Sequence, residues 1–337
     1  MSNARILVGD VRERLQEVPD GSVQTCVTSP PYWGLRDYGQ QAQIGLEQTP
    51  DDYVAEMVAV FREVRRVLAD DGTLWLNLGD SYVGTGDKGD LQDPKHREGR
   101  SGQSKAVNKS VDGLPSKNLV GIPWRVAFAL QSDGWWLRQD IIWAKPNPMP
   151  EPVKDRCTKA HEYVFLLTKS AQYFYSAAAV AERSETAGES RGGGHKASAT
   201  GEYIMRQEGQ RLDRYGVTPE TRNKRSVWTI ATKPYSGAHF AVMPMTLAEP
   251  CILAGSMSGD TVLDPFAGSG TVGVVALRHD RNFIGVELNP EYAALAESRI
   301  YDDGPLLNEV TVDDATFPNP CAPCAPTKGR THAVRST

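Results

Sequence analysis

The hexapeptide Thr28–Trp33 combines residue types that could hold a planar nucleobase. It follows an apolar run, Val23 to Val27, that predicts a buried strand, and two prolines end that strand because they cannot donate to a ladder. The prolines also stiffen the backbone that presents the carbonyls of Ser29 and Pro30. These oxygens and the Ser29 hydroxyl can accept hydrogen bonds from an exocyclic amine, while Tyr32 offers a face for stacking. A Ser-Pro-Pro turn beside a core aromatic is the alternative interpretation of this segment.

A second segment, 264–271, has the pattern of a nucleotide-binding turn between a strand and a helix. Gly268 and Gly270 allow positive φ and let a ligand approach the backbone closely. The amide groups at the start of the helix expected from Thr271 to Arg278 point toward such a ligand. The next expected strand ends at Glu287, at about the interval where such folds place a carboxylate on ribose hydroxyls.

Together the two segments resemble the motifs of the amino-group DNA methyltransferases. The sequence Val27-Thr28-Ser29-Pro30-Pro31-Tyr32 is similar to the catalytic motif in the form associated with cytosine N4, and Asp264-Pro265-Phe266-Ala267-Gly268-Ser269-Gly270-Thr271 is similar to the S-adenosylmethionine motif. The resemblance implies that Ser29, Pro30, Pro31 and Tyr32 are catalytic. It implies a cofactor site made of Asp10, Asp264, Pro265, Phe266, Gly268, Ser269, Gly270, Thr271, Glu287 and His239.

The order of the motifs resembles the circularly permuted beta group, in which the catalytic motif precedes the cofactor motif. The target-recognition segment then lies between them, where residues 183–226 carry a basic excess. The resemblance implies double-stranded DNA as the partner, and a cognate restriction endonuclease stays open as a second partner. Because an amine inside a duplex cannot be reached, the base would be flipped onto Tyr32, with Ser29 Oγ and the Pro30 carbonyl accepting from the amine. Phosphate contacts are expected from Lys145, Arg206, Arg211 and Arg214.

Other functions remain as alternatives. Adenine enzymes more often carry Asp where this chain has Ser29, so cytosine N4 is favoured over adenine N6. A catalytically silent DNA-binding protein would not need Ser29, Tyr32 and Glu287 together. A dinucleotide-dependent oxidoreductase is disfavoured because the Gly-x-Gly-x-x-Gly spacing is missing. An RNA or protein-glutamine methyltransferase is disfavoured because two basic polar segments suit a long duplex.

The elements that must position these motifs predict an α/β fold. Strands alternate with helices, which predicts a doubly wound, mostly parallel sheet with an antiparallel hairpin. The resemblance implies that this is the Rossmann-like methyltransferase fold, circularly permuted, with polar DNA-facing insertions. We expect the hairpin to pair Glu162–Leu167 with Tyr173–Tyr175. The expected division is a catalytic half (1–182, with a mobile basic insertion at 84–117), a recognition segment (183–226), a cofactor half (227–302) and a disordered tail (303–337).

Composition bounds the protein class. The chain has 337 residues, a formal net charge of −5 and five cysteines, which fits a reducing cytoplasm and requires any DNA-binding surface to be local. No apolar run reaches membrane-spanning length. Cys321 and Cys324 form a single Cys-x-x-Cys pair, so no metal site is expected. Cys251 follows a proline, as the nucleophile of cytosine C5 methylation does, but its apolar helical surroundings predict a buried structural residue.

Overall fold

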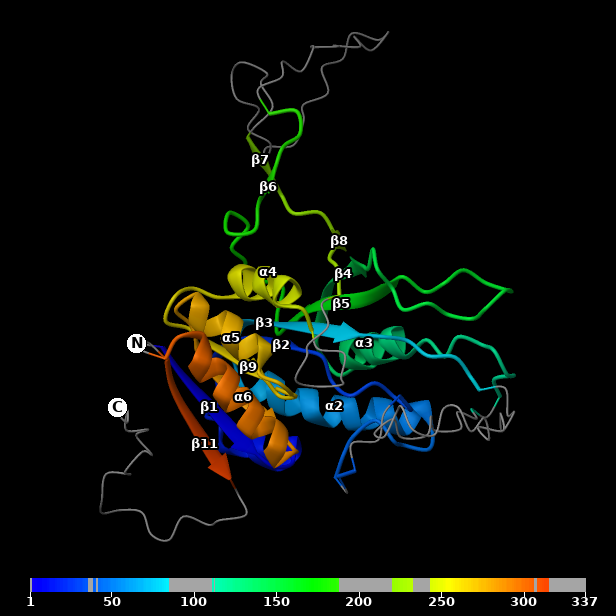
Figure 1. Ribbon diagram of the computed structural model, residues 1–337, viewed down its shortest axis with the longest axis horizontal. Helices are drawn as coiled ribbons and strands as arrows, with labels where there is room; N and C mark the ends of the chain where they lie inside the picture. The colour runs from blue at the N-terminus through cyan, green and yellow to red at the C-terminus, as the bar shows by residue number, and fades with distance from the viewer. Residues whose placement is uncertain are drawn as a thin grey trace, which may run out of the picture.

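The computed structural model describes residues 2–35, 39–40, 42–84, 111, 113–187, 220–232, 243–305 and 308–314. Its centre is a sheet with the strand order β11-β1-β10-β9-β2-β3-β5-β4-β8 (Figure 1). The six strands on the β11 side run parallel: β11 (Asn308–Asp314), β1 (Ser2–Val8), β10 (Asn282–Glu287), β9 (Thr261–Asp264), β2 (Val23–Thr28) and β3 (Leu68–Leu78). β5 (His161–Thr168) is antiparallel to both β3 and β4 (Trp136–Ala144), and β8 (Val227–Thr229) adds a parallel edge.

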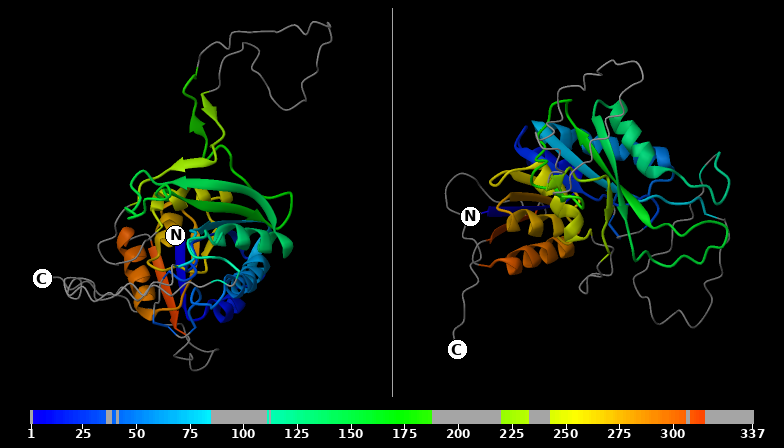
Figure 2. Two further views of the ribbon diagram at one scale, coloured as in Figure 1. Left: turned by 90° about the vertical axis from the view of Figure 1, so that its right-hand side faces the viewer. Right: turned by 90° about the horizontal axis from the view of Figure 1, so that it is seen from above.

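Helices cover both faces of this sheet, as the views from the side and from above show (Figure 2). One face carries α1 (Val11–Arg14) with the 3-10 turn η1 (Leu15–Glu17), α2 (Pro50–Val67) and α3 (Ile122–Ser132). The other carries α4 (Met245–Gly255), α5 (Thr271–Arg278) and α6 (Pro290–Asp303). The predicted α/β fold with a doubly wound, mostly parallel sheet is therefore confirmed.

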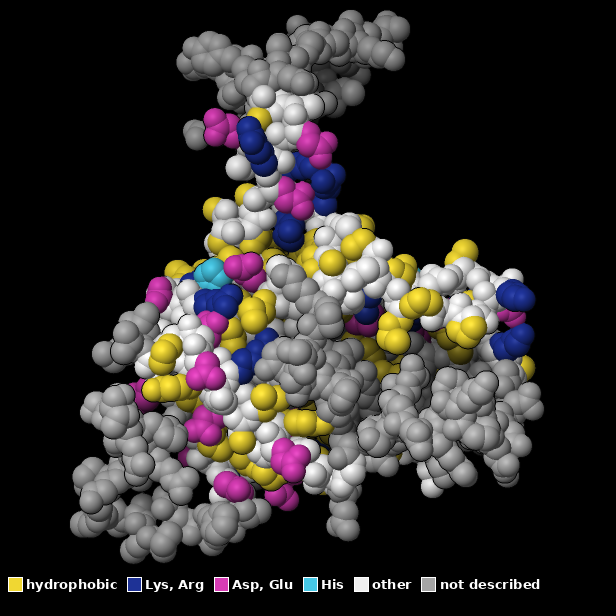
Figure 3. Space-filling model, viewed as in Figure 1, with side chains coloured by type: hydrophobic (Ala, Val, Ile, Leu, Met, Phe, Trp, Pro, Cys, Tyr) yellow, Lys and Arg dark blue, Asp and Glu magenta, His cyan; other side chains and the backbone are white. Residues whose placement is uncertain are grey.

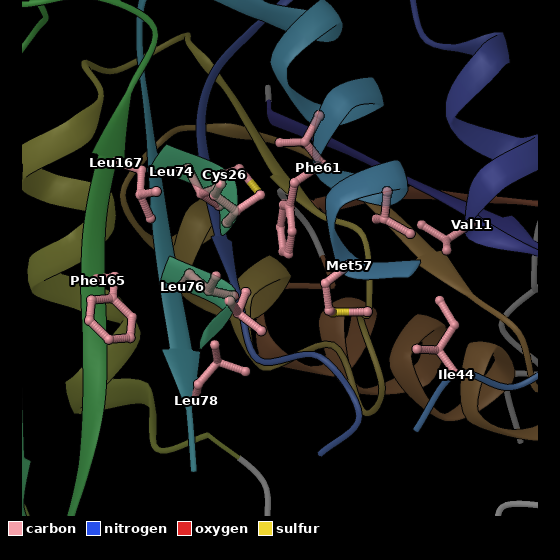
Figure 4. Close-up of a cluster of buried hydrophobic side chains, with 14 of the residues drawn as sticks. Val11, Cys26, Ile44, Met57, Phe61, Leu74, Leu76, Leu78, Phe165 and Leu167 are labelled. Atoms are coloured by element: carbon pink, nitrogen blue, oxygen red, sulfur yellow. The ribbon is translucent and has the colours of Figure 1, made fainter. Parts of the chain in front are cut away.

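Alternation along the strands builds two cores. Cys26, Leu74 and Leu76 pack toward α2 and α3, while Val27 and Trp75 point to the α4 side. Figure 4 shows the first cluster, in which Phe61 of α2 lies against the sheet. Each large side chain buried in this way contributes about 1.5–3 kcal/mol.

Helix ends follow the sequence signals. Thr49 caps α2, since its hydroxyl accepts from the Asp52 amide at 3.1 Å, and Pro50 occupies the first helical position. Asn289 caps α6 in the same way, accepting from the Glu291 amide at 2.9 Å. The bounds predicted for α5 and β10 agree with the structure.

Three predictions about elements are wrong. The antiparallel partners of β5 are β3 and β4, and Tyr173–Tyr175 forms no strand. The sequence also predicts a helix that ends near Asp71-Gly72 and a strand over Thr73–Leu78. In the structure α2 ends at Val67 and β3 begins at Leu68, because the chain enters the sheet directly from the helix. The disordered-tail prediction for 303–337 fails at β11, which pairs in parallel with β1; residues 315–337 lie outside the described part of the chain.

A two-stranded ribbon, β6 (Glu182–Arg183) with β7 (Thr221–Arg222), projects from the body beyond α4 (Figure 1). It flanks residues 188–219, which are not described. No helix among the described residues is long and apolar enough to cross a membrane.

Candidate active site

The base-binding motif and the glycine-rich turn meet at neighbouring strand ends. β2 and β9 are paired in parallel, with Cys26 opposite Leu263, so Ser29 and Pro265 leave the sheet at the same edge. The Thr28 hydroxyl donates to Asp264 Oδ1 at 2.6 Å, and this hydrogen bond joins the two strand ends directly. Segments more than 200 residues apart in sequence are thus brought together.

The β2–β9 pair is also where the winding of the sheet reverses. α2, which follows β2, covers one face, and α5, which follows β9, covers the other. Open α/β sheets bind ligands at the carboxyl ends of strands at such a switch point. The position of both motifs is therefore a consequence of the topology.

Asp264 is a buried carboxyl that orders the turn. Its Oδ1 accepts the Thr28 hydroxyl and, at 3.0 Å, the amide of Phe266. Burial raises its pKa to about 7, and the two hydrogen bonds oppose that rise. Gly270 then adopts φ 73, where a side chain would be strained, and α5 begins at Thr271.

Glu287 closes the turn from the next strand. Its Oε2 accepts the Gly268 amide at 2.8 Å, and Oε1 accepts the Asn289 amide at 2.9 Å. Burial raises the pKa of this carboxyl, while these backbone hydrogen bonds lower it. A carboxylate has about four acceptor positions, so these backbone hydrogen bonds leave room for a ribose hydroxyl. A Cβ built on Gly268 would meet only one atom within 4 Å, the Phe266 carbonyl oxygen at 3.9 Å, so the approach to this backbone is open. These features fit a nucleoside cofactor.

Asp10 lies at the end of β1, next to Glu287 across the Gly9–Glu287 backbone hydrogen bond of 2.9 Å. Its side chain caps α1 and accepts from the Arg12 guanidinium. Burial would raise its pKa, but the hydrogen bonds from Arg12 prevail and lower it. The location agrees with a place at the edge of a cofactor site, although the carboxylate is already paired with Arg12.

Tyr32 is held by Asn77 of β3, by Glu162 of β5 and by Ser29 in its own segment after β2. Its hydroxyl donates to Glu162 Oε2 at 2.7 Å and lies 3.3 Å from both Ser29 Oγ and Asn77 Oδ1. A Cβ on Gly79 would come within 2.5 Å of the Tyr32 ring, so only glycine at the end of β3 permits this position. Burial and the Glu162 charge raise the pKa of Tyr32 well above its ordinary value.

Several of these groups were not expected from the sequence. Three of them lie outside both motifs: Glu162, Asn77 and Tyr53. The Tyr53 hydroxyl donates to the Pro31 carbonyl at 2.9 Å. Glu162 is a charged residue at the start of an apolar run, and this position could have marked it as a candidate site residue. Because the wrong strand was expected to pair with β5, the neighbours of Glu162 could not be predicted. Correct pairing places His161 opposite Ala144 and so brings Glu162 beside Lys145.

Lys145 points inward in this structure. Its ammonium pairs with Glu162 Oε1 and lies 4.2 Å from the Trp143 ring centroid, and only 17% of the side chain is exposed. A contact with DNA phosphate would compete with this ion pair, and Lys145 stays an untested prediction. Arg206, Arg211, Arg214 and His239 lie outside the described residues, as does most of the basic insertion 84–117.

The remaining expectations concern cysteines and metals. Cys251 is buried in α4 and donates to the Leu247 carbonyl at 3.3 Å, so the prediction of a buried structural residue is confirmed. Within the described ranges no group of three or more His, Cys, Asp or Glu side chains is arranged to hold a metal ion. Cys321 and Cys324 are not described.

A cavity of about 650 Å³ opens elsewhere, lined by Arg62, Arg65, Arg66, Lys169, Asp20, Gly21, Asp70 and Asp133. It lies by the amino end of β3, away from both motifs, and ion pairs join Arg62 to Asp133 and Arg66 to Asp20. The two motifs meet at the opposite edge of the sheet.

Known proteins match the chain over most of its length. The DNA methylase family N6_N4_Mtase matches residues 23–298, a range that includes both motifs. The chain belongs to this family of amino-group DNA methyltransferases. Family members use S-adenosylmethionine as the methyl donor, so the cofactor prediction is confirmed at this level.

Relatives of the methylase include restriction-modification enzymes. Type II methyltransferase M.Cfr9I of Citrobacter freundii is 46% identical over 301 residues, covering 89% of this chain and 88% of the relative. Type II methyltransferase M.SmaI of Serratia marcescens is 46% identical over 300 residues, covering 89% and 91%.

Solved structures agree with the fold of the methylase. TTHA0409 of Thermus thermophilus, complexed with S-adenosyl-L-methionine, has 25% identity and a TM-score of 0.55, with 91% of this chain and 97% of that chain covered. The cytosine-N4-specific PvuII DNA methyltransferase has a TM-score of 0.59 at 22% identity, covering 93% and 95%, and supports the fold alone.

Proposed function

We propose that this methylase is a Type II enzyme that transfers a methyl group from S-adenosylmethionine to the exocyclic N4 amine of cytosine in double-stranded DNA. The supporting observation is the 2.6 Å hydrogen bond from Thr28 to Asp264, which sets the base-binding motif beside the turn that would hold the cofactor. Ser29 at the head of the Pro-Pro-Tyr segment favours cytosine over adenine within the family.

The residues of the chain would act mainly by positioning. The amine of cytosine is a weak nucleophile, because its lone pair is delocalised into the ring. Hydrogen bonds from the amine to Ser29 Oγ and the Pro30 carbonyl would favour a more tetrahedral nitrogen and free that lone pair for in-line attack. Tyr32 would stack on the flipped base, and such stacking contributes about 1–3 kcal/mol per base.

The cofactor, when bound, supplies an electrophilic methyl group. We propose that the Glu287 carboxylate holds its ribose, with Asp10 near the adenine, while Phe266 and the backbone of 268–271 line the site. Pro265 and the buried Asp264 would support this turn without needing direct contact. His239 is proposed to cover the methionine end.

We further propose the following organisation. Because the β2 motif precedes the β9 motif, the chain would belong to the permuted beta group, with residues 183–226 as the target-recognition segment. Arg206, Arg211 and Arg214 would then contact phosphates. The division into halves at 1–182 and 227–302, a cognate endonuclease and a cytoplasmic location are part of the same proposal.

The deciding experiment identifies the product. Unmethylated DNA of mixed sequence is incubated with the protein and methyl-labelled S-adenosylmethionine, then digested to nucleosides and analysed by mass and retention. N4-methylcytosine is the expected product. N6-methyladenine would overturn the choice of base, and unlabelled DNA would count against the proposed activity.

A further inference from the structure

The hydroxyl of Tyr32 is the centre of a hydrogen-bond network that extends beyond both motifs. Glu162 lies 2.7 Å from it, and Asn77 Oδ1 and Ser29 Oγ each lie 3.3 Å away. Asn77 Nδ2 donates to Glu162 Oε2 at 3.2 Å, and Lys145 pairs with the other oxygen of that carboxylate. The network therefore links the ends of β2, β3 and β4 with the start of β5.

The network has a defined direction. A tyrosine hydroxyl has one proton, and the carboxylate at 2.7 Å is a nearer acceptor than the amide oxygen at 3.3 Å. The amide of Asn77 cannot easily reverse, because its Nδ2 also donates to the Tyr163 carbonyl at 3.1 Å. Glu162 is acceptor-only when ionised, and its other carboxylate oxygen pairs with the Lys145 ammonium. The proton of Tyr32 is thereby directed to Glu162.

This direction fixes what Ser29 can do. A serine hydroxyl can donate or accept, and it rotates to suit its surroundings. With the Tyr32 proton directed to Glu162, the Tyr32 oxygen is left to accept from Ser29 across the 3.3 Å separation. The lone pairs of Ser29 Oγ then remain for another donor.

The distinction matters for an amine that must attack. A hydroxyl that donated to the amine nitrogen would occupy the lone pair needed for methyl transfer, whereas one that accepts from the amine leaves it free. We propose that Glu162 is a positioning residue that orients the Tyr32 and Ser29 hydroxyls so that Ser29 Oγ accepts a hydrogen bond from the exocyclic amine of the target base. The inference rests on the proposed function, and it applies equally to an amine of cytosine or adenine.

The test compares Glu162→Gln with the wild-type protein. The Gln amide can donate to the Tyr32 oxygen, so the Tyr32 hydroxyl would donate to Ser29 Oγ instead of accepting from it. The Ser29 hydroxyl proton would then be free to bind the lone pair of the target amine. We expect the single-turnover methylation rate to fall roughly 10- to 100-fold, the kinetic equivalent of one or two hydrogen bonds. The Kd values for S-adenosylmethionine and for DNA should stay within about twofold. Glu63→Gln is the matched control, since Glu63 also loses an ion pair, with Arg66 at 2.9 Å on α2, but lies outside the network.

A double-mutant cycle with Tyr32→Phe separates this role from general damage. Tyr32→Phe keeps the ring and the Glu162–Lys145 pair but removes the hydroxyl through which Glu162 acts. If both residues act through one chain, the double variant should be no slower than the slower single variant. Should Glu162→Gln fail to fold, as judged by thermal unfolding, Tyr32→Phe alone must still show the rate loss with unchanged cofactor affinity.

Three results would overturn the inference: wild-type rates in Glu162→Gln, losses that multiply in the double variant, or a loss confined to cofactor or DNA affinity. The wild-type product is identified first by mass. A product methylated elsewhere than on an exocyclic amine would overturn the proposed function and the inference together. A normal wild-type product with a fully active Glu162→Gln variant would overturn the inference alone.

Discussion

Asp264 carries an electrostatic cost at the point where the two motifs join. Its carboxyl is buried, with a pKa raised to about 7 by burial, yet it must accept hydrogen bonds from Thr28 and from the Phe266 amide. Between the unfolded value of 3.8 and about 7, the folded protein therefore holds a proton that the unfolded chain releases. This cost agrees with a structural role for the Asp264 carboxyl, which orders the turn through its hydrogen bonds with Thr28 and Phe266.

The first prediction concerns the pH dependence of stability. Ionising the buried Asp264 carboxyl lowers the free energy of unfolding. This loss is absent below about pH 4, grows as the pH rises to about 7, and is constant at higher pH. Asp264→Asn keeps an acceptor for Thr28 and cannot ionise. The free energy of unfolding of the variant should therefore rise relative to the wild type between pH 4.5 and pH 8, by up to about 3 kcal/mol. Urea denaturation at both pH values measures this difference, and a difference that does not change with pH would contradict the burial of an ionised Asp264.

The second prediction concerns Glu287 as a ribose ligand. Glu287→Ala removes an acceptor that still has free positions after binding the Gly268 and Asn289 amides. A hydrogen bond to a carboxylate is lost, with a contribution of about 1.5–3 kcal/mol, so the affinity for S-adenosylmethionine should fall at least 10-fold. Isothermal titration measures it, with the exposed Glu291→Ala in the first turn of α6 as the control. Equal affinities in the two variants would reject the ribose assignment.

At the scale of elements, local signals predicted most of the structure. The Thr49 and Asn289 caps, each followed by a proline, mark the starts of α2 and α6 in the sequence, and the glycine-rich turn marks the start of α5. The partner of β5 could not be found in this way. Aromatic Tyr173–Tyr175 lies close in sequence, whereas β4 is separated from β5 by residues 145–160, and non-local pairing leaves no local signal. The Tyr175 ring instead stacks on Trp75, with ring centroids 6.4 Å apart.

β11 was missed for a different reason. Its sequence alternates, with Val310 and Val312 packed on the α4-side core, but polar residues surround them and the strand lies at the sheet edge. An edge strand needs only one apolar face, so its composition resembles that of a disordered tail. The same limit applies to the site: both motifs were predicted, but Glu162 and Asn77 come into contact with Tyr32 only through strand pairing in three dimensions.

The third prediction tests the bond between β2 and β9. Thr28→Val is nearly isosteric but leaves the buried Asp264 carboxyl without the donor at 2.6 Å. Loss of a hydrogen bond to a buried acidic group should lower the free energy of unfolding by about 1–3 kcal/mol and also weaken cofactor binding, because the turn loses an anchor. Thr311→Val on β11 is the matched control, since its hydroxyl makes only a 3.4 Å contact with the Ala4 carbonyl. Chemical denaturation should find the control within about 0.5 kcal/mol of the wild type. Equal stability of the two variants would show that the strand ends do not depend on this bond.

At the scale of the whole molecule, the ribbon of β6 and β7 projects away from the body that carries both motifs. Its basic side chains are interleaved with acidic ones on the surface (Figure 3). Glu182 lies 3.1 Å from Arg225 and 3.6 Å from Arg222, so these cations stabilise the ribbon itself. If residues 183–226 form the recognition segment, the sequence-specific contacts must come mainly from the residues between β6 and β7, not from the paired strands themselves.

The fourth prediction uses the geometry of the ribbon to remove that segment. Arg183 and Thr221 are paired across β6 and β7, so residues 184–220 can be replaced by a short Asn-Gly turn without moving the ends of the ribbon. Both motifs and both cores lie in the remaining body, and the shortened protein should therefore fold and bind S-adenosylmethionine with near-normal affinity. Its binding to DNA should lose sequence preference, and the dependence of log Kd on log salt should become shallower because phosphate contacts are lost. Titration of matched and scrambled duplexes at several salt concentrations measures both effects. Retained sequence preference with an unchanged salt slope would place target recognition elsewhere, in which case the loops around β4 and β5, close to Tyr32, would be the next region to test.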